Sequence, residues 1–221
     1  MTASSRLFLI LFLFFVLAML ATQASASVFV IGDQDDKFTV SFPDSWAMSH
    51  NQKPDDKLTI LAPNDGSDAS CRVRVRDDQR FTVYPASSAQ SIQQANYGAA
   101  FWDKYLAQYD DVSVVRVVHG TPMGWAQASS AEATYTSTLG SSVQKRAMMR
   151  GGVFQGRAFI VECAATAEGF PQWQGTFANI MNSFAPMVTG NGAINSYYRD
   201  FPNDPILIIN RQAQDDRTLY Y

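Results

Sequence analysis

The sequence predicts an α+β domain, in which an antiparallel sheet is flanked by two main helices as an α/β/α sandwich. Seven short stretches alternate apolar and polar residues or consist of β-branched residues, which is typical of strands. Two longer stretches repeat apolar residues at steps of three and four, which is typical of amphipathic helices. Short turns join consecutive strands, and such turns connect antiparallel neighbours. A sheet covered by helices on one face only is the alternative.

The first three strands are expected before any helix. Residues 37–42 alternate apolar and polar side chains and end at Pro43. Residues 57–62 and 70–76 repeat the pattern, with a Pro-Asn-Asp-Gly turn between them. Between the first two strands, a loop carries Trp46, which we expect to act as a large aromatic anchor.

The first helix is expected over residues 88–109. Ser87 or Ser88 can cap its first turn by accepting a backbone N–H bond. Gly98 lowers the helix propensity but permits close packing. The apolar stripe consists of Ile92, Ala95, Ala99, Trp102, Leu106 and Tyr109.

Four more strands and a second helix complete the domain. The strands are expected at 112–118, 125–137, 143–154 and 157–165, with turns at 119–124, 139–142 and Gln155-Gly156. The pair Gly151-Gly152 indicates a bulge or a close approach of another backbone. The second helix is expected over residues 171–184, because Pro171 suits a first helical position. Its apolar stripe consists of Phe170, Trp173, Phe177, Ile180 and Phe184.

Residues 1–26 have the pattern of a secretory signal. Arg6 supplies a positive charge, residues 7–21 are apolar, and Ala24-Ser25-Ala26 fits a cleavage site. The apolar run is shorter than the roughly 20 residues that cross a bilayer. We therefore expect a periplasmic or secreted protein without a membrane span after cleavage. Without cleavage, the segment would tether the domain to the membrane.

Composition narrows the classes of partner. The 221 residues include 17 Lys and Arg and 20 Asp and Glu, for a net charge of −3. This mild acidity argues against nucleic acid as a partner, because phosphate binding needs clustered positive charge. We expect one domain over residues 27–188 and a tail over 189–221. The tail has apolar patches, and it could pack on the domain or add a strand to a protein partner. The sequence leaves the oligomeric state open.

Cys71 and Cys163 are the only cysteines, and each lies in an alternating segment. In an oxidising compartment they can form a disulfide, which would close a loop of about 90 residues. Two separate buried thiols are the alternative.

The segment Phe38-Thr39-Val40-Ser41-Phe42-Pro43-Asp44-Ser45-Trp46 resembles the opening of PsbP-like domains, a hydrophobic strand followed by Phe-Pro, two residues and Trp. The long helix after the third strand and a final helix ending in Asn182-Ser183-Phe184 are similar too. The resemblance covers residues 28–186. It implies a PsbP-like fold and a binding module rather than an enzyme. It transfers no metal or partner residues, and the tail and the cysteine pair depart from the family.

Two rows of side chains are candidates for binding. Arg72, Arg74 and Arg76 share one face of a strand, because side chains alternate along it. They could bind an anion or an acidic partner, or they could lie on an exposed sheet edge beside acidic residues of the next strand. The second row is Tyr97, Phe101 and Tyr105, which could pack in the core or against the tail, or line a recognition groove.

Catalytic and metal-binding patterns are weak. The two histidines, His50 and His119, are expected in loops, and no Gly-x-Ser-x-Gly motif occurs. Residues 33–36 and 64–68 are acidic enough for calcium but also fit ordinary turns. The adjacent aspartates Asp55-Asp56, Asp77-Asp78 and Asp110-Asp111 are expected to be solvated.

These patterns favour a non-enzymatic binding or accessory module of the bacterial cell envelope, without a cofactor. A hydrolase whose site combines scattered residues is one alternative. A structural envelope protein that binds a partner through its tail is another.

Overall fold

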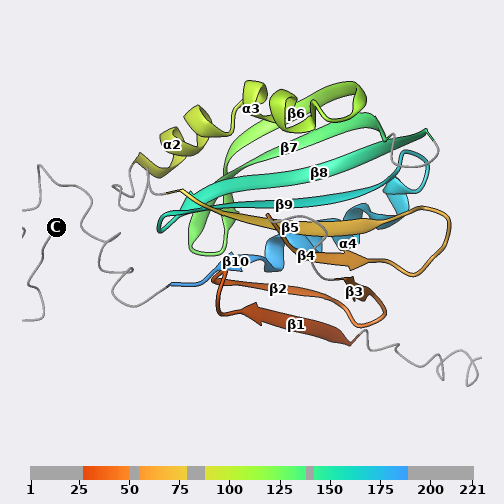
Figure 1. Ribbon diagram of the computed structural model, residues 1–221, viewed down its shortest axis with the longest axis horizontal. Coiled ribbons are helices and arrows are strands. Elements are labelled where there is room, and N and C mark those ends of the chain that lie inside the picture. The colour runs from red at the N-terminus through yellow and green to blue at the C-terminus, as the bar shows by residue number, and fades with distance from the viewer. Residues whose placement is uncertain (1–26, 50–54, 79–87, 138–141, 189–221) are drawn as a thin grey trace, which may run out of the picture.

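The computed structural model describes residues 27–49, 55–78, 88–137 and 142–188 (Figure 1). The expected signal segment, His50, most of the turn at 139–142 and the tail lie outside these residues. Within the described ranges, no helix is long and apolar enough to cross a membrane.

A seven-stranded antiparallel sheet is the central layer, with the order β3-β4-β5-β9-β8-β7-β6. One meander consists of β3, β4 and β5, and the other consists of β6, β7, β8 and β9. The two meanders join where β5 pairs with β9. Its strands are β3 (Ala47–Ser49), β4 (Asp56–Leu61), β5 (Ser70–Asp77), β6 (Asp110–Met123), β7 (Ala126–Ser137), β8 (Val143–Phe154) and β9 (Arg157–Thr166).

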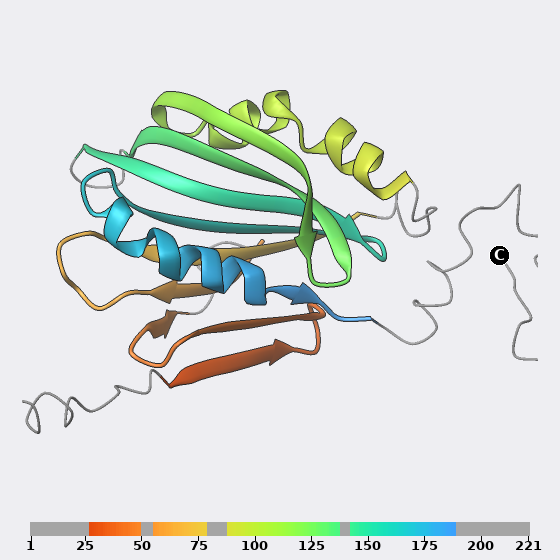
Figure 2. The same cartoon turned by 180° about the vertical axis from the view of Figure 1, so that it is seen from behind.

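Helices lie on both faces of this sheet, which confirms the expected α+β sandwich. Helices α2 (Ala89–Asn96) and α3 (Ala99–Leu106) pack over β6, β7 and β8. Helix α4 (Phe170–Ser183) crosses the opposite face (Figure 2). Pro171 stands in the first turn of α4, as expected.

A second, three-stranded sheet shares the α4 side of the molecule. Its strands are β1 (Val28–Asp33), β2 (Phe38–Pro43) and β10 (Ala185–Pro186), in the order β1-β2-β10. The expectation of one continuous sheet is therefore wrong, and β1, β3 and β10 were not expected at all. The physical reason lies in β2, whose apolar face packs over the large sheet instead of pairing with it.

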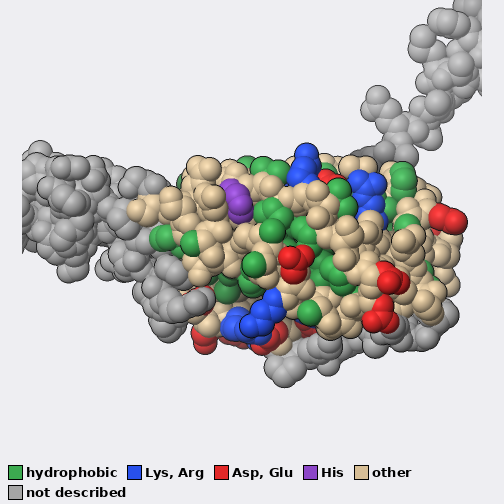
Figure 3. Space-filling view, turned by 90° about the horizontal axis from the view of Figure 1, so that it is seen from above, with side chains coloured by type: hydrophobic (Ala, Val, Ile, Leu, Met, Phe, Trp, Pro, Cys, Tyr) green, Lys and Arg blue, Asp and Glu red, His purple; other side chains and the backbone are tan. Residues whose placement is uncertain are grey.

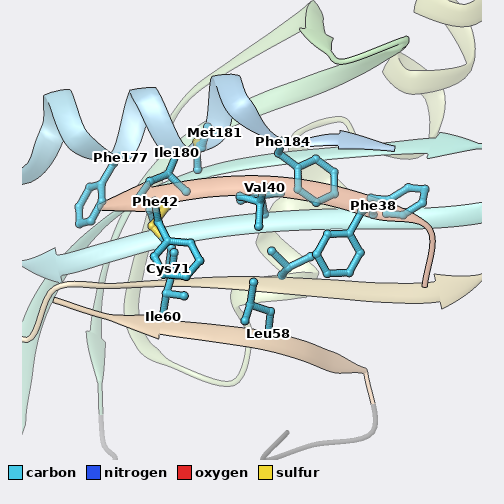
Figure 4. Close-up of a cluster of buried hydrophobic side chains, with 14 of the residues drawn as sticks. Phe38, Val40, Phe42, Leu58, Ile60, Cys71, Phe177, Ile180, Met181 and Phe184 are labelled. Carbon is cyan, nitrogen blue, oxygen red and sulfur yellow. A yellow bond between two sulfur atoms is a disulfide. The ribbon is translucent and has the colours of Figure 1, made fainter. Parts of the chain in front are cut away.

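The main core fills the space between the two sheets and α4 (Figure 4). Phe38, Val40 and Phe42 of β2 meet Leu58 and Ile60 of β4 there, and all five are at most 3% exposed. Trp46 is buried beside them, with its ring centroid 5.3 Å from that of Trp173 and 6.3 Å from that of Phe177. The expected aromatic anchor is thus present.

The helix expected over residues 88–109 is two helices. Gly98 has an extended backbone, with φ −74° and ψ −176°, so the chain cannot continue as a helix through it. At this break the chain lies against Gly151 of β8, where a Cβ atom would be 2.8 Å from the Tyr97 ring. Ser88 is the N-cap of α2, but its side chain makes no capping hydrogen bond.

The turn expected at 119–124 is instead part of β6, which continues to Met123. Register shifts absorb the irregular residues, including Gly120 with φ +77°. The reversal comes at Gly124 and Trp125. In β8, by contrast, pairing runs through Gly151-Gly152 without a shift, so the expected bulge is absent and the close approach is present.

Candidate binding groove between helix α3 and strand β5

The three arginines lie on an interior strand, because β5 is flanked by β4 and β9. The expected exposed edge is therefore wrong, whereas acidic neighbours on the adjacent strands are present. Arg72 lies 3.5 Å from Asp56 and 3.3 Å from Glu162. Arg74 lies 2.6 Å from Asp56. Arg76 pairs with Asp55 at 2.5 Å, and its side chain is 73% exposed.

The aromatic row lies beside these arginines. Tyr97 stands at the joint between α2 and α3, and Phe101 and Tyr105 belong to α3. The ring of Phe101 is 4.6 Å from Tyr97 and 6.1 Å from Tyr105, measured between centroids. The guanidinium carbon of Arg74 lies 5.2 Å from the Tyr105 ring centroid. The structure thus brings together two rows that are separated in the sequence.

The aromatic row and two of the three arginines, Arg74 and Arg76, line one cavity of about 450 Å³, which we name the α3–β5 groove. Cavities of this size hold small ligands. Its lining consists of Asp55, Arg74, Val75, Arg76, Asp78, Tyr97, Phe101, Lys104, Tyr105, Ala158 and Ile160. Arg72 does not line it and faces a neighbouring polar cavity of about 280 Å³. Figure 3 views the side of the molecule that carries α2 and α3, where basic and acidic side chains lie side by side and no large patch of one sign forms.

A buried polar network forms the boundary between the two cavities. Glu162 is 3% exposed and accepts hydrogen bonds from Arg72, from the Tyr105 hydroxyl at 2.7 Å and from the Tyr135 hydroxyl at 3.3 Å. Asp56 is equally buried and accepts hydrogen bonds from Arg72 and Arg74. A buried carboxylate with several donors is held in one position, so this part of the floor is fixed before any ligand arrives.

Burial and neighbouring charge shift the pKa values of this network. Burial raises the pKa of Tyr105 and of Tyr135 above the ordinary tyrosine value, and the Glu162 carboxylate raises both further. Burial by itself would lower the pKa of Arg72. The attraction to Glu162 outweighs it, together with interactions with Tyr105 and Tyr109, so the pKa is raised. Both effects keep the phenols neutral and the guanidinium charged near neutral pH.

A disulfide joins Cys71 of β5 to Cys163 of β9, with 4.0 Å between their Cα atoms. The two cysteines are cross-strand partners, and so are the next residues along, Arg72 and Glu162. Because side chains alternate, the disulfide lies in the main core, on the face opposite the groove. The two strands that carry the groove floor are therefore covalently tied.

The charged side chains at the rim of the groove are more exposed than those of its floor. A hydrogen bond from Arg76 to Asp55 and the attraction of that carboxylate raise the pKa of Arg76. Lys104 is exposed on α3 and forms no ion pair with a residue that the structure describes. Lys104, Ala158 and Ile160 were missed by sequence reasoning. The pairing of β5 with β9, which brings Ala158 and Ile160 to the site, joins segments more than 80 residues apart.

Other sequence candidates fall elsewhere. His119 lies in β6 rather than in a loop, and its Nδ1 atom is 2.5 Å from Ser129 Oγ. Ser129 is fully buried and also contacts the Gln93 carbonyl at 3.3 Å, so its hydroxyl is not placed to attack a substrate. Asp56 is buried and paired, so the expectation that it is solvated is wrong.

The two acidic segments act as turns. Asp33 accepts hydrogen bonds from the backbone N–H groups of Asp35 and Asp36, at 2.9 and 2.8 Å. Asp65 accepts one from the backbone of Ser67 at 2.9 Å. Among the described residues, no three His, Cys, Asp or Glu side chains form a group that could hold a metal ion.

Comparison with known proteins finds similar folds only. No protein-family model and no curated protein matches the chain. The similar solved structures include the cyanobacterial PsbP of Synechocystis sp. PCC 6803, with 10% identity and a TM-score of 0.49 over 75% of this chain and 96% of that one. LpqN of Mycobacterium tuberculosis, described as involved in cell envelope biogenesis, has 11% identity and a TM-score of 0.49 over 73% and 91%.

A Pseudomonas aeruginosa protein of unknown function, PA94, described as a putative regulator, is also similar. It has 12% identity and a TM-score of 0.48 over 73% of this chain and 99% of that one. A PsbP is thus among the similar structures, in keeping with the resemblance seen in the sequence. At such identities the likeness concerns the fold alone.

Proposed function

We propose that this protein is an exported, non-enzymatic binding module of the cell envelope, and that it recognises its partner through the α3–β5 groove. One observation supports this most. Two arginines and three aromatic side chains, from separate segments of the chain, line a single open cavity. Arginine and aromatic residues are the types enriched in the parts of interfaces that contribute most to binding.

The rigidity of the floor supports a binding role. Asp56 and Glu162 hold Arg74, Arg72 and Tyr105 below the groove through hydrogen bonds of 2.6 to 3.5 Å. The disulfide ties β5 to β9 behind them. A site that is already ordered loses less conformational entropy when a partner binds, which favours affinity.

Export is supported by two features. The sequence of residues 1–26 has the pattern of a secretory signal. The structure also contains a disulfide, and disulfides persist in oxidising compartments such as the periplasm or the extracellular space.

The proposal is tested by purifying the tagged full-length protein from cell envelopes and analysing the bound material by mass spectrometry. The wild type is expected to retain a companion in a fixed ratio, and Arg76→Glu combined with Phe101→Ala is expected to lose it. Arg116→Glu is the matched control, because Arg116 is 67% exposed and ion-paired like Arg76 but lies on β6, outside the groove. A wild type without any companion, or one retained equally by the groove variant, would contradict the proposal.

A further inference from the structure

We infer that the ligand of the α3–β5 groove is an amphiphilic monoanion, a single carboxylate carried on an apolar chain or ring. This inference deepens the proposed function and depends on it, because it names the class of ligand that the same site takes.

One part of the groove is apolar. Ala158 and Ile160 belong to β9 and lie on its outer face, where they are only partly buried. Phe101 stands over them on α3 and is also partly buried. These three side chains border open space, so an apolar chain or ring that enters the groove removes their surface from water.

Among the charged side chains that line the groove, Lys104 is the cation that forms no ion pair with a residue that the structure describes. The lining contains Arg74, Arg76 and Lys104 against Asp55 and Asp78. Arg74 is already committed to Asp56 at 2.6 Å, in a pair that is largely buried. Arg76 pairs with Asp55 where both are exposed, and an exposed pair of this kind contributes little and exchanges readily. Arg76 and Lys104 are therefore the cations that a ligand can reach.

The same charges disfavour other ligands. A phosphate dianion would bring two charges close to the carboxylates of Asp55 and Asp78, and like charges at short range repel. A neutral amphiphile would leave Lys104 without a counter-ion at the rim. A single carboxylate supplies one counter-ion to Lys104, and the apolar body of such a ligand fits a cavity of about 450 Å³.

The test uses the purified protein and a fluorescent amphiphilic anion, 8-anilino-1-naphthalenesulfonate, which serves as the reporter of binding. Laurate and 1-naphthaleneacetate, both below micellar concentrations, then compete for the site, and they distinguish an acyl from an aryl body. We expect at least one of them to displace the reporter. We also expect dodecanol and dodecyl phosphate to compete at least about tenfold more weakly than laurate, since about 1.4 kcal/mol corresponds to tenfold in affinity.

Variants connect the binding to the groove. Lys104→Glu and Phe101→Ala are each expected to weaken carboxylate binding about tenfold or more, whereas Arg116→Glu is expected to leave it unchanged, with thermal melting used to confirm that all three fold. Equal competition by dodecanol and laurate, or equal binding by Lys104→Glu and wild type, would overturn the inference. If laurate and naphthaleneacetate both fail while a companion is still retained through the groove, the ligand class is wrong and the proposed function stands.

Discussion

Glu162 is the residue on which the groove floor depends most. It is almost fully buried, and Arg72 is its only ion-pair partner among the described residues. Removing one member of a buried pair leaves an uncompensated charge, which costs more than the pair itself contributes. The two residues are direct cross-strand partners, so the effect can be isolated with single and double variants.

We expect Arg72→Met to lower the free energy of unfolding by about 3 kcal/mol. The double variant Arg72→Met/Glu162→Met should recover much of this loss, because the Glu162 carboxylate is then no longer buried without a cation, and Asp56 keeps Arg74 as its partner. Urea denaturation measures both, and Arg116→Met provides the exposed control, with an expected change within about 0.5 kcal/mol. If the double variant has a lower free energy of unfolding than Arg72→Met, the Glu162 carboxylate is accommodated in the fold even without Arg72, and the expectation is wrong.

Tyr105 and Tyr135 should make the protein sensitive to alkali. Their pKa values are raised in the folded state, mainly by burial. Below about pH 10 both the folded and the unfolded chain keep these phenolic protons. Above it the unfolded chain releases them first, so stability is lost as pH rises, by up to about 1.4 kcal/mol per pH unit for each phenol.

Urea denaturation between pH 8 and pH 11 checks this expectation. The wild type should lose stability steeply above about pH 10, and Tyr105→Phe/Tyr135→Phe should show a clearly shallower slope. The phenylalanine variant will be less stable at pH 8, because Glu162 loses two donors. Identical slopes for the two proteins would contradict the assignment of raised pKa values.

At the scale of elements, the joint between α2 and α3 is set by one glycine of the sheet. Added at Gly151, a Cβ atom would lie 2.8 Å from Tyr97 Cδ1 and 3.0 Å from the Trp102 ring. These are parts of buried rings, which cannot move aside without shifting the helices. The position of α3, and with it the wall of the groove, therefore depends on Gly151.

The same glycine-to-alanine substitution should have opposite effects on stability at Gly151 and at Gly175. Gly151→Ala is expected to destabilise the fold by about 1–3 kcal/mol through overpacking. Gly175→Ala in α4, where a Cβ atom would meet nothing within 4 Å, is expected to stabilise it by about 0.5–1 kcal/mol. Thermal melting compares the two variants, and a neutral Gly151→Ala would show that the joint is loosely packed.

Local sequence patterns predicted which helices and strands form, but they missed the break between α2 and α3 and the full length of β6. The alternation in β2, β4 and β5 and the stripe of α4 placed these elements to within a residue or two. The break at Gly98 could not be predicted, because it depends on contact with Gly151, more than 50 residues later. The length of β6 was missed because Gly120 and Pro122, which usually mark turns, are accommodated here in a strand by register shifts.

At the scale of the whole molecule, the disulfide joins the two meanders of the large sheet. It links positions 92 residues apart, so its loss frees a long loop in the unfolded chain. The chain-entropy contribution of such a loop is about 4.6 kcal/mol. We expect Cys71→Ala/Cys163→Ala to melt roughly 10 °C lower than the wild type, measured by circular dichroism. A change of no more than about 2 °C would show that the unfolded chain is already restrained.

The same long-range pairing explains how much of the site could be predicted. The arginine row and the aromatic row were visible because each lies within one segment with a regular spacing. Glu162 gave no such signal, because it is one acidic residue in an alternating strand, and Asp56 stood out only as one of two adjacent aspartates expected in solvent. Their role arises only when β4 and β9 come to lie on either side of β5.

The proposed function requires that the α3–β5 groove, rather than another exposed surface, contacts the partner. The most direct measurement places the photo-cross-linking amino acid p-benzoylphenylalanine at position 101 in the groove or at position 125, the 79% exposed tryptophan in the β6–β7 turn. Cells are irradiated, and the intact mass of the purified protein is measured. We expect a discrete adduct at position 101 and none at 125. An adduct at position 125 with none at 101 would contradict the proposed function.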